Sequence, residues 1–335
     1  MSHCPVSVVI PSFNCGRLVV QAVESVLAQT SRPTEIIVVD DGSTDDTRER
    51  LVRYRDYVRY VYQPNQGVSA ARNHGIRLAT QEFVAFLDAD DVWHPLKMQL
   101  QMPLFGQSPA PPMVGSSQFD WPASRFPDVD LARPFRVSAM DWAYLVVKND
   151  LPTSSIVVRR SVLERVGPFD LSLQGPEDRD MWLRVAEIAP IARVELPLMG
   201  YRDVPGSVSK QADRCRTGLL RILRKQDQTG RWRGRWLLRR KAYSYVYHTC
   251  SEIYNTGGRY PAAAANCLKS LLWYPLAYRP VEVTTRAERP KRLAVSLLRW
   301  CRLKAPARPR PAEFDADTPD ALQVLRREVH LQFAE

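Results

Sequence analysis

The sequence predicts an α/β fold with a mostly parallel central sheet that is flanked by helices. Short runs rich in β-branched and aromatic residues alternate with longer stretches whose apolar residues recur at helical spacing. Each short run ends in polar, turn-forming residues such as "PSFN" and "DDGST". This alternation indicates parallel strands connected by helices, which is a Rossmann-like arrangement.

The elements follow in order along the N-terminal half. The expected strands cover residues 6–10, 35–40, 57–62 and 82–88. Helices are expected between them in "RLVVQAVESVLAQT", in "TDDTRERLVRY" with Thr44 as the N-cap, and in "VSAARNHGIRLAT". The apolar character of the strands indicates burial on both faces. A later strand and helix are expected in residues 151–170, and a further helix begins near Pro176.

Composition and length limit the class of protein. The 335 residues are 45% hydrophobic and 25% charged, as in ordinary globular proteins. No run reaches the roughly 18 to 20 apolar residues that cross a bilayer, and no secretory signal is recognised. The six cysteines form no CxxC pair, which favours a reducing compartment. A cytoplasmic protein is therefore expected.

Three carboxylates follow the fourth strand in "FLDADD", at Asp88, Asp90 and Asp91. Two like charges about 5 Å apart repel by roughly 3 kcal/mol at an effective dielectric near 20. Solvent exposure or a bound cation must offset this repulsion. Too few carboxylates converge for an all-protein calcium site, so Mg²⁺ or Mn²⁺ shared with substrate phosphates is the expected cation.

The other loops carry further candidate residues. Ligands of such sheets bind at the carboxyl ends of the strands, where all four loops should meet. Phe13 is placed to stack on a base or to join the core, and Gly67 allows close approach of the backbone. Arg72 is placed to reach a phosphate or to bridge to a surface acid.

Together, "SVVIPSFN", "IIVVDDGSTDDT", "NQGVSAARN" and "FLDADD" closely resemble the motifs of glycosyltransferase family 2, from about Val6 to Ser209. The resemblance implies the GT-A-type nucleotide-diphospho-sugar transferase fold and an inverting, non-processive enzyme. It implies Asp90 as the metal ligand on the diphosphate, with Mn²⁺ or Mg²⁺ as the cofactor. For the donor it implies that Pro11 and Phe13 frame the base and that Asp41 accepts a hydrogen bond from it. Asp88 would contact ribose or a metal-bound water. Gly67 and Arg72 are the remaining donor-binding residues.

The segment "GPEDRDMWLRV" places three acids in the first turn of the expected helix. Acids there interact favourably with the helix dipole, by roughly 0.3–1 kcal/mol each. By the resemblance, however, Asp178 is the general base, with Glu177 and Trp182 in support. The implied reaction is a single displacement in which an acceptor hydroxyl, on a glycan or lipid-linked glycan, attacks the sugar of a nucleotide-sugar donor. A UDP-sugar is the commonest donor, and dTDP or GDP stay open.

Two positions depart from the family pattern. Val204 stands where the family often carries a histidine after "YR". "QTGRW" at residues 228–232 matches the QxxRW string of processive synthases, which have transmembrane helices, and we interpret the match as chance.

Charge divides the chain unevenly. Residues 1–209 hold 21 Lys and Arg against 25 Asp and Glu, whereas residues 210–335 hold 26 against 11. We expect a catalytic domain at 1–209, a basic helical extension at 210–303, and a Pro-rich linker with a short helix at 304–335. The basic residues of 210–241 alternate with Leu and Trp. This pattern fits either packing on the catalytic domain or peripheral contact with an anionic membrane, at its inner face.

The rival interpretation is a nucleic-acid-binding or membrane-binding protein with a non-catalytic domain. No zinc knuckle or RNA-binding motif supports a nucleic-acid partner, and the N-terminal half is slightly acidic. The absence of GxGxxG after the first strand argues against a dinucleotide enzyme.

Overall fold

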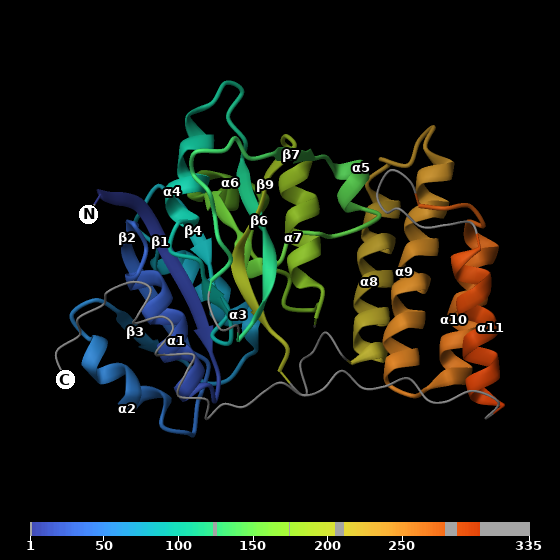
Figure 1. The fold of residues 1–335 in the computed structure, drawn as a ribbon, viewed down its shortest axis with the longest axis horizontal. Helices are drawn as coiled ribbons and strands as arrows, with labels where there is room; N and C mark the ends of the chain where they lie inside the picture. Colours follow the sequence, from blue (N-terminus) through green and yellow to red (C-terminus); the bar gives the residue numbers. More distant parts are fainter. Residues whose placement is uncertain (1, 123–125, 174, 205–210, 279–286, 302–335) are drawn as a thin grey trace.

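The computed structural model describes residues 2–122, 126–173, 175–204, 211–278 and 287–301. Across these residues one nine-stranded sheet forms, in the order β3-β2-β1-β4-β8-β6-β9-β5, with β7 paired to β9 (Figure 1). The strands are β1 (Ser2–Ser12), β2 (Ser31–Asp40), β3 (Arg59–Tyr62), β4 (Phe83–Phe86), β5 (Val92–Trp93), β6 (Met113–Trp121), β7 (Val137–Met140), β8 (Val157–Arg159) and β9 (Ile191–Arg202).

The sheet is mixed. The strands β3, β2, β1 and β4 are parallel to one another, as the sequence predicts. Beyond β4, strand β8 is antiparallel to both β4 and β6, while β6 and β9 are parallel. The α/β prediction is confirmed, and its parallel character holds for the N-terminal half, where each connection contains a helix.

Helices cover both faces of the parallel strands because successive strand residues point to opposite sides. Val9 of β1 faces the cluster that includes Ala71 of α3 (Val68–Leu78). Val8 faces the cluster that includes Val19 and Val23 of α1 (Gly16–Leu27). All of these side chains are fully buried, so the sheet is buried on both faces.

Shorter helices complete this part of the chain. They are α2 (Thr47–Leu51), α4 (Lys97–Gln101), α5 (Trp142–Leu145), α6 (Arg160–Val166) and α7 (Glu177–Ala186), with 3-10 turns at Val52–Tyr54, Met102–Gly106 and Thr153–Ser155. The predicted N-cap at Thr44 is wrong, because α2 begins at Thr47 after Asp46. Thr44 instead donates its backbone N–H to Asn14 Oδ1 over 2.8 Å, which holds the loop after β2 against the loop after β1.

The described residues of the C-terminal part form four helices: α8 (Ala212–Gln228), α9 (Trp236–Thr256), α10 (Tyr260–Trp273) and α11 (Glu288–Trp300). They stand side by side at the end of the molecule remote from β1–β3 (Figure 1). The predicted boundary at 209/210 and the segment 304–335 lie outside the described residues. None of the described helices is long and apolar enough to span a membrane.

Packing joins α8 to the sheet part of the molecule. Leu219, Ile222 and Leu223 of α8 are buried in the same cluster as Val9 of β1. Lys225 of α8 forms ion pairs with Asp170 at 3.0 Å and with the buried Asp180 of α7 at 2.5 Å. The first helix of the basic segment therefore packs against α7, the helix that carries Asp178.

Gly75 of α3 is the point where this helix lies closest to the sheet. A Cβ atom at this position would lie 2.3 Å from Val9 Cγ1, far below contact distance. We predict that Gly75→Ala lowers the free energy of unfolding by about 1–3 kcal/mol by overpacking, although alanine favours helix. Chemical denaturation measures the change.

Gly106→Ala is the matched control, because a Cβ at Gly106 meets no atom within 4 Å. If both variants unfolded at the same denaturant concentration as the parent, the close approach of α3 to β1 would be refuted.

Candidate functional site

The loops after β1, β2 and β4 meet at one edge of the sheet, because these strands are parallel. Asp41 donates its backbone N–H to Ser12 O over 2.8 Å, which joins the first two loops. Asp88 follows β4 at the same edge. The expectation that the loops gather is therefore met in the structure.

Asp41 organises the side of the edge where a base is expected. Its carboxylate accepts hydrogen bonds from Gln63 Nε2 (2.7 Å) and from the backbone N–H groups of Gln66 (2.9 Å) and Gly67 (2.7 Å). Gly67 has a φ of 89° and directly precedes α3, and open space surrounds the position of a Cβ there. Asp41 thus fixes the loop that begins α3.

Phe13 and Pro11 differ in exposure. Pro11 is buried within β1, where it pairs in register with Val39. Phe13 is 47% exposed just beyond the strand, so it does not belong to the core. An exposed ring beside the Asp41 loop leaves an apolar face available to a ligand.

The three carboxylates of "DADD" have three different environments. Asp88 is half-buried and pairs with Arg72. Asp91 is buried, where its carboxylate accepts from Ser154 Oγ (2.6 Å) and from Arg202 N–H (3.1 Å). Burial, followed by the charge of Asp90, raises the pKa of Asp91 well above its ordinary value. Asp91 is therefore a structural group, held by donors from Ser154 and Arg202.

Asp90 is the member of this group that remains available to a cation. No side chain among the described residues lies within hydrogen-bonding or ion-pair distance of its carboxylate. Burial, followed by the charge of Asp88, raises the pKa of Asp90 to about 6. A hard divalent cation suits such a carboxylate. Within the described ranges no group of three or more His, Cys, Asp or Glu could hold a metal ion, so the protein alone offers only a partial ligand set.

Arg72 links the Asp88 loop to α7. Its Nη2 lies 2.6 Å from Asp88 Oδ1, and its Nη1 lies 2.7 Å from Glu177 Oε1. The Arg72 side chain is only 4% exposed. Burial disfavours the charge of Arg72, but the two carboxylates outweigh this effect and raise its pKa. The sequence predicts that Arg72 either reaches a phosphate or bridges to a surface acid. In the structure it bridges two acids, and one of them, Glu177, is buried.

Asp178 lies beside this bridge in the first turn of α7. Pro176 occupies the N-cap position rather than the first turn. Asn149 Nδ2 donates to Asp178 Oδ2 over 3.2 Å. Burial, followed by the charge of Glu177, raises the pKa of Asp178 to about 7, while Arg72 opposes the shift. A carboxylate with a pKa near neutrality is suited to accept a proton.

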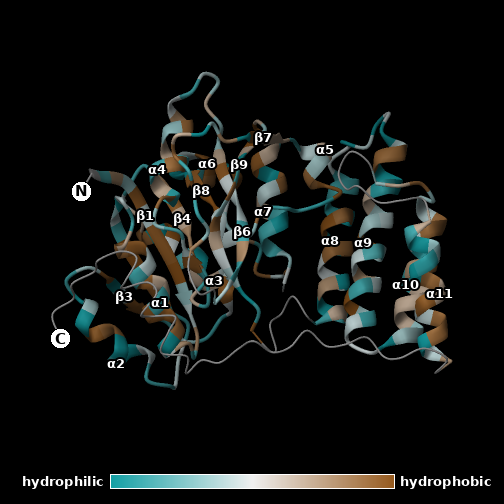
Figure 2. Ribbon diagram, in the orientation of Figure 1, coloured by the Kyte–Doolittle hydropathy of each residue, from teal (hydrophilic) through white to brown (hydrophobic). Residues whose placement is uncertain are grey.

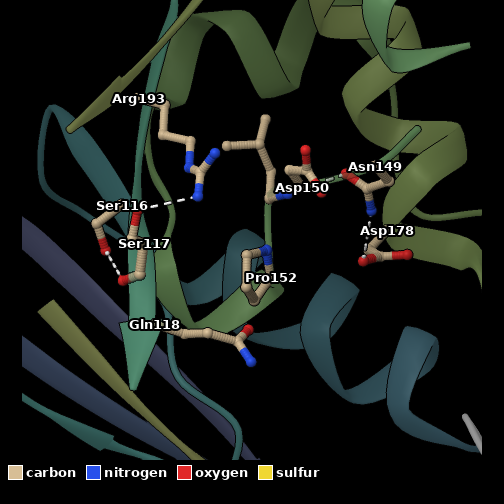
Figure 3. Close-up of a pocket in the computed structure, with 9 residues that line it drawn as sticks. Ser116, Ser117, Gln118, Asn149, Asp150, Pro152, Asp178 and Arg193 are labelled. Atoms are coloured by element: carbon tan, nitrogen blue, oxygen red, sulfur yellow. Dashed lines mark hydrogen bonds between the residues drawn. The ribbon is translucent and has the colours of Figure 1, made fainter. Parts of the chain in front are cut away.

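A pocket of about 440 Å³ opens at Asp178. Figure 3 shows Asn149 directed at Asp178 on one side and Arg193 directed at Ser117 across the pocket, a contact of 2.9 Å. The remaining lining is mainly polar and comes from β6 and from the segment before the 3-10 turn at Thr153: Ser116, Gln118, Asp150, Leu151 and Pro152. Amide, hydroxyl, carboxylate and guanidinium groups on facing walls suit a polyhydroxylated ligand.

Trp182 lies deeper than the pocket. It is fully buried, packs against Phe86 and Phe169, and donates Nε1–H to Leu151 O over 3.2 Å. Trp182 therefore holds the segment that forms the pocket wall, without lining the pocket.

Sequence reasoning missed three residues of this site: Asn149, Arg193 and Arg202. Arg202 is buried and donates Nε–H to Asp90 O over 2.9 Å and Nη2–H to Gln21 Oε1 over 2.5 Å. The "YR" pair at 201–202 is the signal that could have drawn attention to it. Arg193 and Asn149 carry no such local signal.

The two departures from the family pattern have separate locations. Val204 lies two residues beyond Arg202, whose side chain already contacts the Asp90 loop. Trp232 of "QTGRW" packs on Trp142 with ring centroids 5.2 Å apart, and Arg231 pairs with Glu187 at 3.0 Å. These contacts account for Arg231 and Trp232 as packing between the loop after α8 and the helices α5 and α7.

The mixed sheet with its acidic edge defines a nucleotide-diphospho-sugar transferase fold of the GT-A type. Residues 7–167 match the model of the family described as Glycosyl transferase family 2. Through this region the chain is similar to glycosyltransferase family 2.

Curated relatives agree with the family. An uncharacterized glycosyltransferase of Nostoc sp. is 36% identical over 179 residues, which cover 49% of this chain and 54% of the relative. Chondroitin synthase of Escherichia coli is 26% identical over 198 residues, covering 56% of this chain and 27% of the synthase. The chain thus spans about half the length of the first relative and about a quarter of the second.

Solved structures share the fold at low sequence identity. The mannosyltransferase PcManGT from Pyrobaculum calidifontis, in complex with GDP-Man and Mn²⁺, is 17% identical with a TM-score of 0.57, over 97% of this chain and 84% of that chain. Residues 1–349 of S. aureus TarS, in complex with UDP-GlcNAc, are 15% identical with a TM-score of 0.52, over 86% and 92%.

The raised pKa of Asp178 predicts a pH-dependent stability. Between about pH 4 and pH 7 the native state holds a proton that the unfolded chain has lost, so the free energy of unfolding falls as pH rises through this window. Asp178→Asn removes this titration. We expect the variant to be more stable than the parent at pH 8, by at most about 4 kcal/mol, and the difference to disappear near pH 4.

Denaturant unfolding across this pH range measures the effect. Asp56→Asn, which removes an exposed carboxylate, is the control for a general loss of negative charge. A stability difference that stayed constant from pH 4 to pH 8 would rule out a proton held at Asp178.

Proposed function

We propose that the protein is a metal-dependent, inverting glycosyltransferase that moves a sugar from a nucleoside diphosphate donor to a hydroxyl acceptor. One observation carries the proposal. The half-buried carboxylates of Asp90 and Asp178 lie close along the chain to the two ends of one salt bridge, since Arg72 joins Asp88 to Glu177. Asp90, which is suited to bind a cation, and Asp178, which is suited to accept a proton, therefore lie on either side of the Arg72 salt bridge.

The nucleoside binds at the loops after β1 and β2 in this proposal. Phe13 offers a ring for stacking, and the Asp41 loop with Gly67 offers carboxylate and backbone groups. Two relatives of the fold were solved with UDP-GlcNAc and with GDP-Man, which supports a nucleotide-sugar donor. A UDP-sugar is our first choice for this chain.

Asp90 holds Mn²⁺ or Mg²⁺ in this proposal, and donor phosphate oxygens supply further ligands, as such cations prefer. When bound, the cation offsets the negative charge of the diphosphate leaving group. The contacts of Arg202 with the Asp91 carboxylate and with the Asp90 carbonyl fix the loop that presents Asp90.

Transfer takes place at the mouth of the 440 Å³ pocket, which receives the acceptor. The Asp178 carboxylate takes the proton of the acceptor hydroxyl while that oxygen forms a bond to the anomeric carbon. The bond from this carbon to the diphosphate oxygen breaks, and its electron pair leaves with the nucleoside diphosphate. One displacement inverts the anomeric configuration, and Asn149 holds the base in place.

Two isosteric variants test the assignment of roles. Asp178→Asn removes the proton acceptor, so we expect it to bind donor with unchanged affinity and to transfer at least 100-fold more slowly. Asp90→Asn removes the metal ligand, so we expect it to lose the Mn²⁺-dependent part of donor binding. Calorimetric titration of UDP-sugars with and without Mn²⁺, followed by transfer assays on a glycan panel, separates the two losses.

Asp56→Asn serves again as the surface control and should keep both activities. Transfer at the parental rate by Asp178→Asn would show that another group is the base. Donor binding that is indifferent to Mn²⁺ in the parent protein would disprove metal dependence.

Arg72 is a positioning residue in this proposal. Arg72→Gln leaves the buried Glu177 and the half-buried Asp88 without their cation, and removing one partner of a buried pair costs about 3–5 kcal/mol. It also removes the positive charge that opposes the raised pKa of Asp178. We expect a lower kcat and a shift of the acid limb of the pH–rate profile to higher pH.

Arg72→Lys keeps the charge but not the two-pronged bridge, so the pH shift should be partly rescued while kcat stays low. Arg77→Gln, on the exposed end of the same helix, is the matched control. An unshifted pH profile in Arg72→Gln would mean that this arginine does not act on the base.

A further inference from the structure

The outward faces of α10 and α11 are apolar, and the two helices pack against each other through their other sides. Cys267 of α10 contacts Arg289 O of α11, and Arg289 in turn donates to Ser270 Oγ over 3.1 Å. Figure 2 shows hydrophobic segments on both helices at the end of the molecule remote from the sheet. We call this surface the α10/α11 face. Its exposed apolar residues are Leu268 and Leu272 of α10 with Leu297, Leu298 and Trp300 of α11.

These apolar side chains are highly exposed to solvent. Leu272 is 68% exposed and Trp300 is 56% exposed. Leu268 and Leu272 lie one turn apart on α10, so they project to the same side. Clustered exposed apolar residues of this kind mark interaction surfaces, whereas single ones do not.

The charges around the α10/α11 face identify the kind of partner. The described residues from 211 to 301 hold 17 Lys and Arg but only 4 Asp and Glu. Each of these four carboxylates already pairs with an arginine: Asp213 with Arg259, Asp227 with Arg239, and Glu252 and Glu288 with Arg292. Lys269 of α10 and Lys291 of α11 are exposed, and Lys269 Nζ lies 5.8 Å from the centroid of the Tyr247 ring. The field of this region is therefore strongly positive.

A second copy of the chain fits this surface poorly. A two-fold interface would place two surfaces of like charge against each other, and like charges at an interface oppose association. An anionic bilayer supplies the opposite charge and an apolar interior together. Tryptophan and leucine suit its interface, and basic residues strengthen the contact.

The earlier part of the basic segment contributes little to such a surface. Of the apolar residues in 210–241, Leu219, Ile222 and Leu223 are buried and Leu220, Trp232 and Leu238 pack against the core. Trp236 and Leu237, at the start of α9, are exposed. The packing interpretation thus accounts for α8, and the apolar surface lies on later helices.

We propose that the α10/α11 face docks on the surface of an anionic lipid bilayer, with Leu272, Leu298 and Trp300 entering the interface. This proposal is independent of the proposed reaction, because none of these residues lines the Asp178 pocket. Docking of this kind attaches the protein at the bilayer surface through the outer faces of these two helices.

Co-sedimentation of the full chain with vesicles tests the proposal. We expect binding to vesicles of 70% phosphatidylcholine and 30% phosphatidylglycerol, at least tenfold weaker binding to phosphatidylcholine alone, and weakening as NaCl is raised. The double variant Leu272→Glu/Leu298→Glu should lose at least tenfold in affinity. The double variant Lys269→Gln/Lys291→Gln should lose about 25-fold in affinity, since each lysine near the surface is worth about fivefold.

Leu131→Glu, which makes the same change at a 52% exposed leucine before β7, is the matched control and should bind like the parent. Thermal unfolding and donor binding confirm that each variant is folded. Equal binding to both kinds of vesicle would overturn the charge argument. Failure of the parent to bind any vesicle would overturn the proposal. Light scattering would then tell whether a second copy of the chain occupies the face.

Discussion

The buried salt bridge of Arg72 with Asp88 and Glu177 is the interaction on which the arrangement of the site depends. It joins three parts of the chain, namely α3, the end of β4 and the first turn of α7. A buried guanidinium needs carboxylate partners to offset its desolvation, and it receives one from each side. One side chain therefore links the three segments and balances two carboxylates at the edge of the sheet.

Electrostatic separation is the second constraint. Three neighbouring aspartates are tolerated because each has a different environment. Asp88 pairs with the Arg72 guanidinium, and Asp91 has a raised pKa and accepts hydrogen bonds. Asp90 is left for a ligand. Asp178 is likewise poised by burial and by Glu177. Perturbed carboxylates that gather at one strand edge are typical of sites where charge changes during a reaction.

The C-terminal helices make two kinds of surface: one packs on α7 and the other is exposed. Through α8 they support α7, because Lys225 pairs with Asp180, which lies in the same first turn of α7 as Asp178. Through α10 and α11 they present exposed leucines and a tryptophan in a strongly basic setting. One part of the extension therefore stabilises the helix that carries the candidate base, and another part is available to a partner.

The sequence by itself determined the parallel strands, their connecting helices and the residues at the strand ends, because hydrophobic periodicity and turn residues are local signals. It also singled out Asp41, Asp90 and Asp178 through motifs that resemble a family. Only the tertiary structure decided what those residues contact. Asp91 meets Ser154 and Arg202, which lie 63 and 111 residues further along the chain, and Arg72 meets Glu177 across 105 residues. Such partners, and hence burial and pKa, depend on packing that no local pattern encodes.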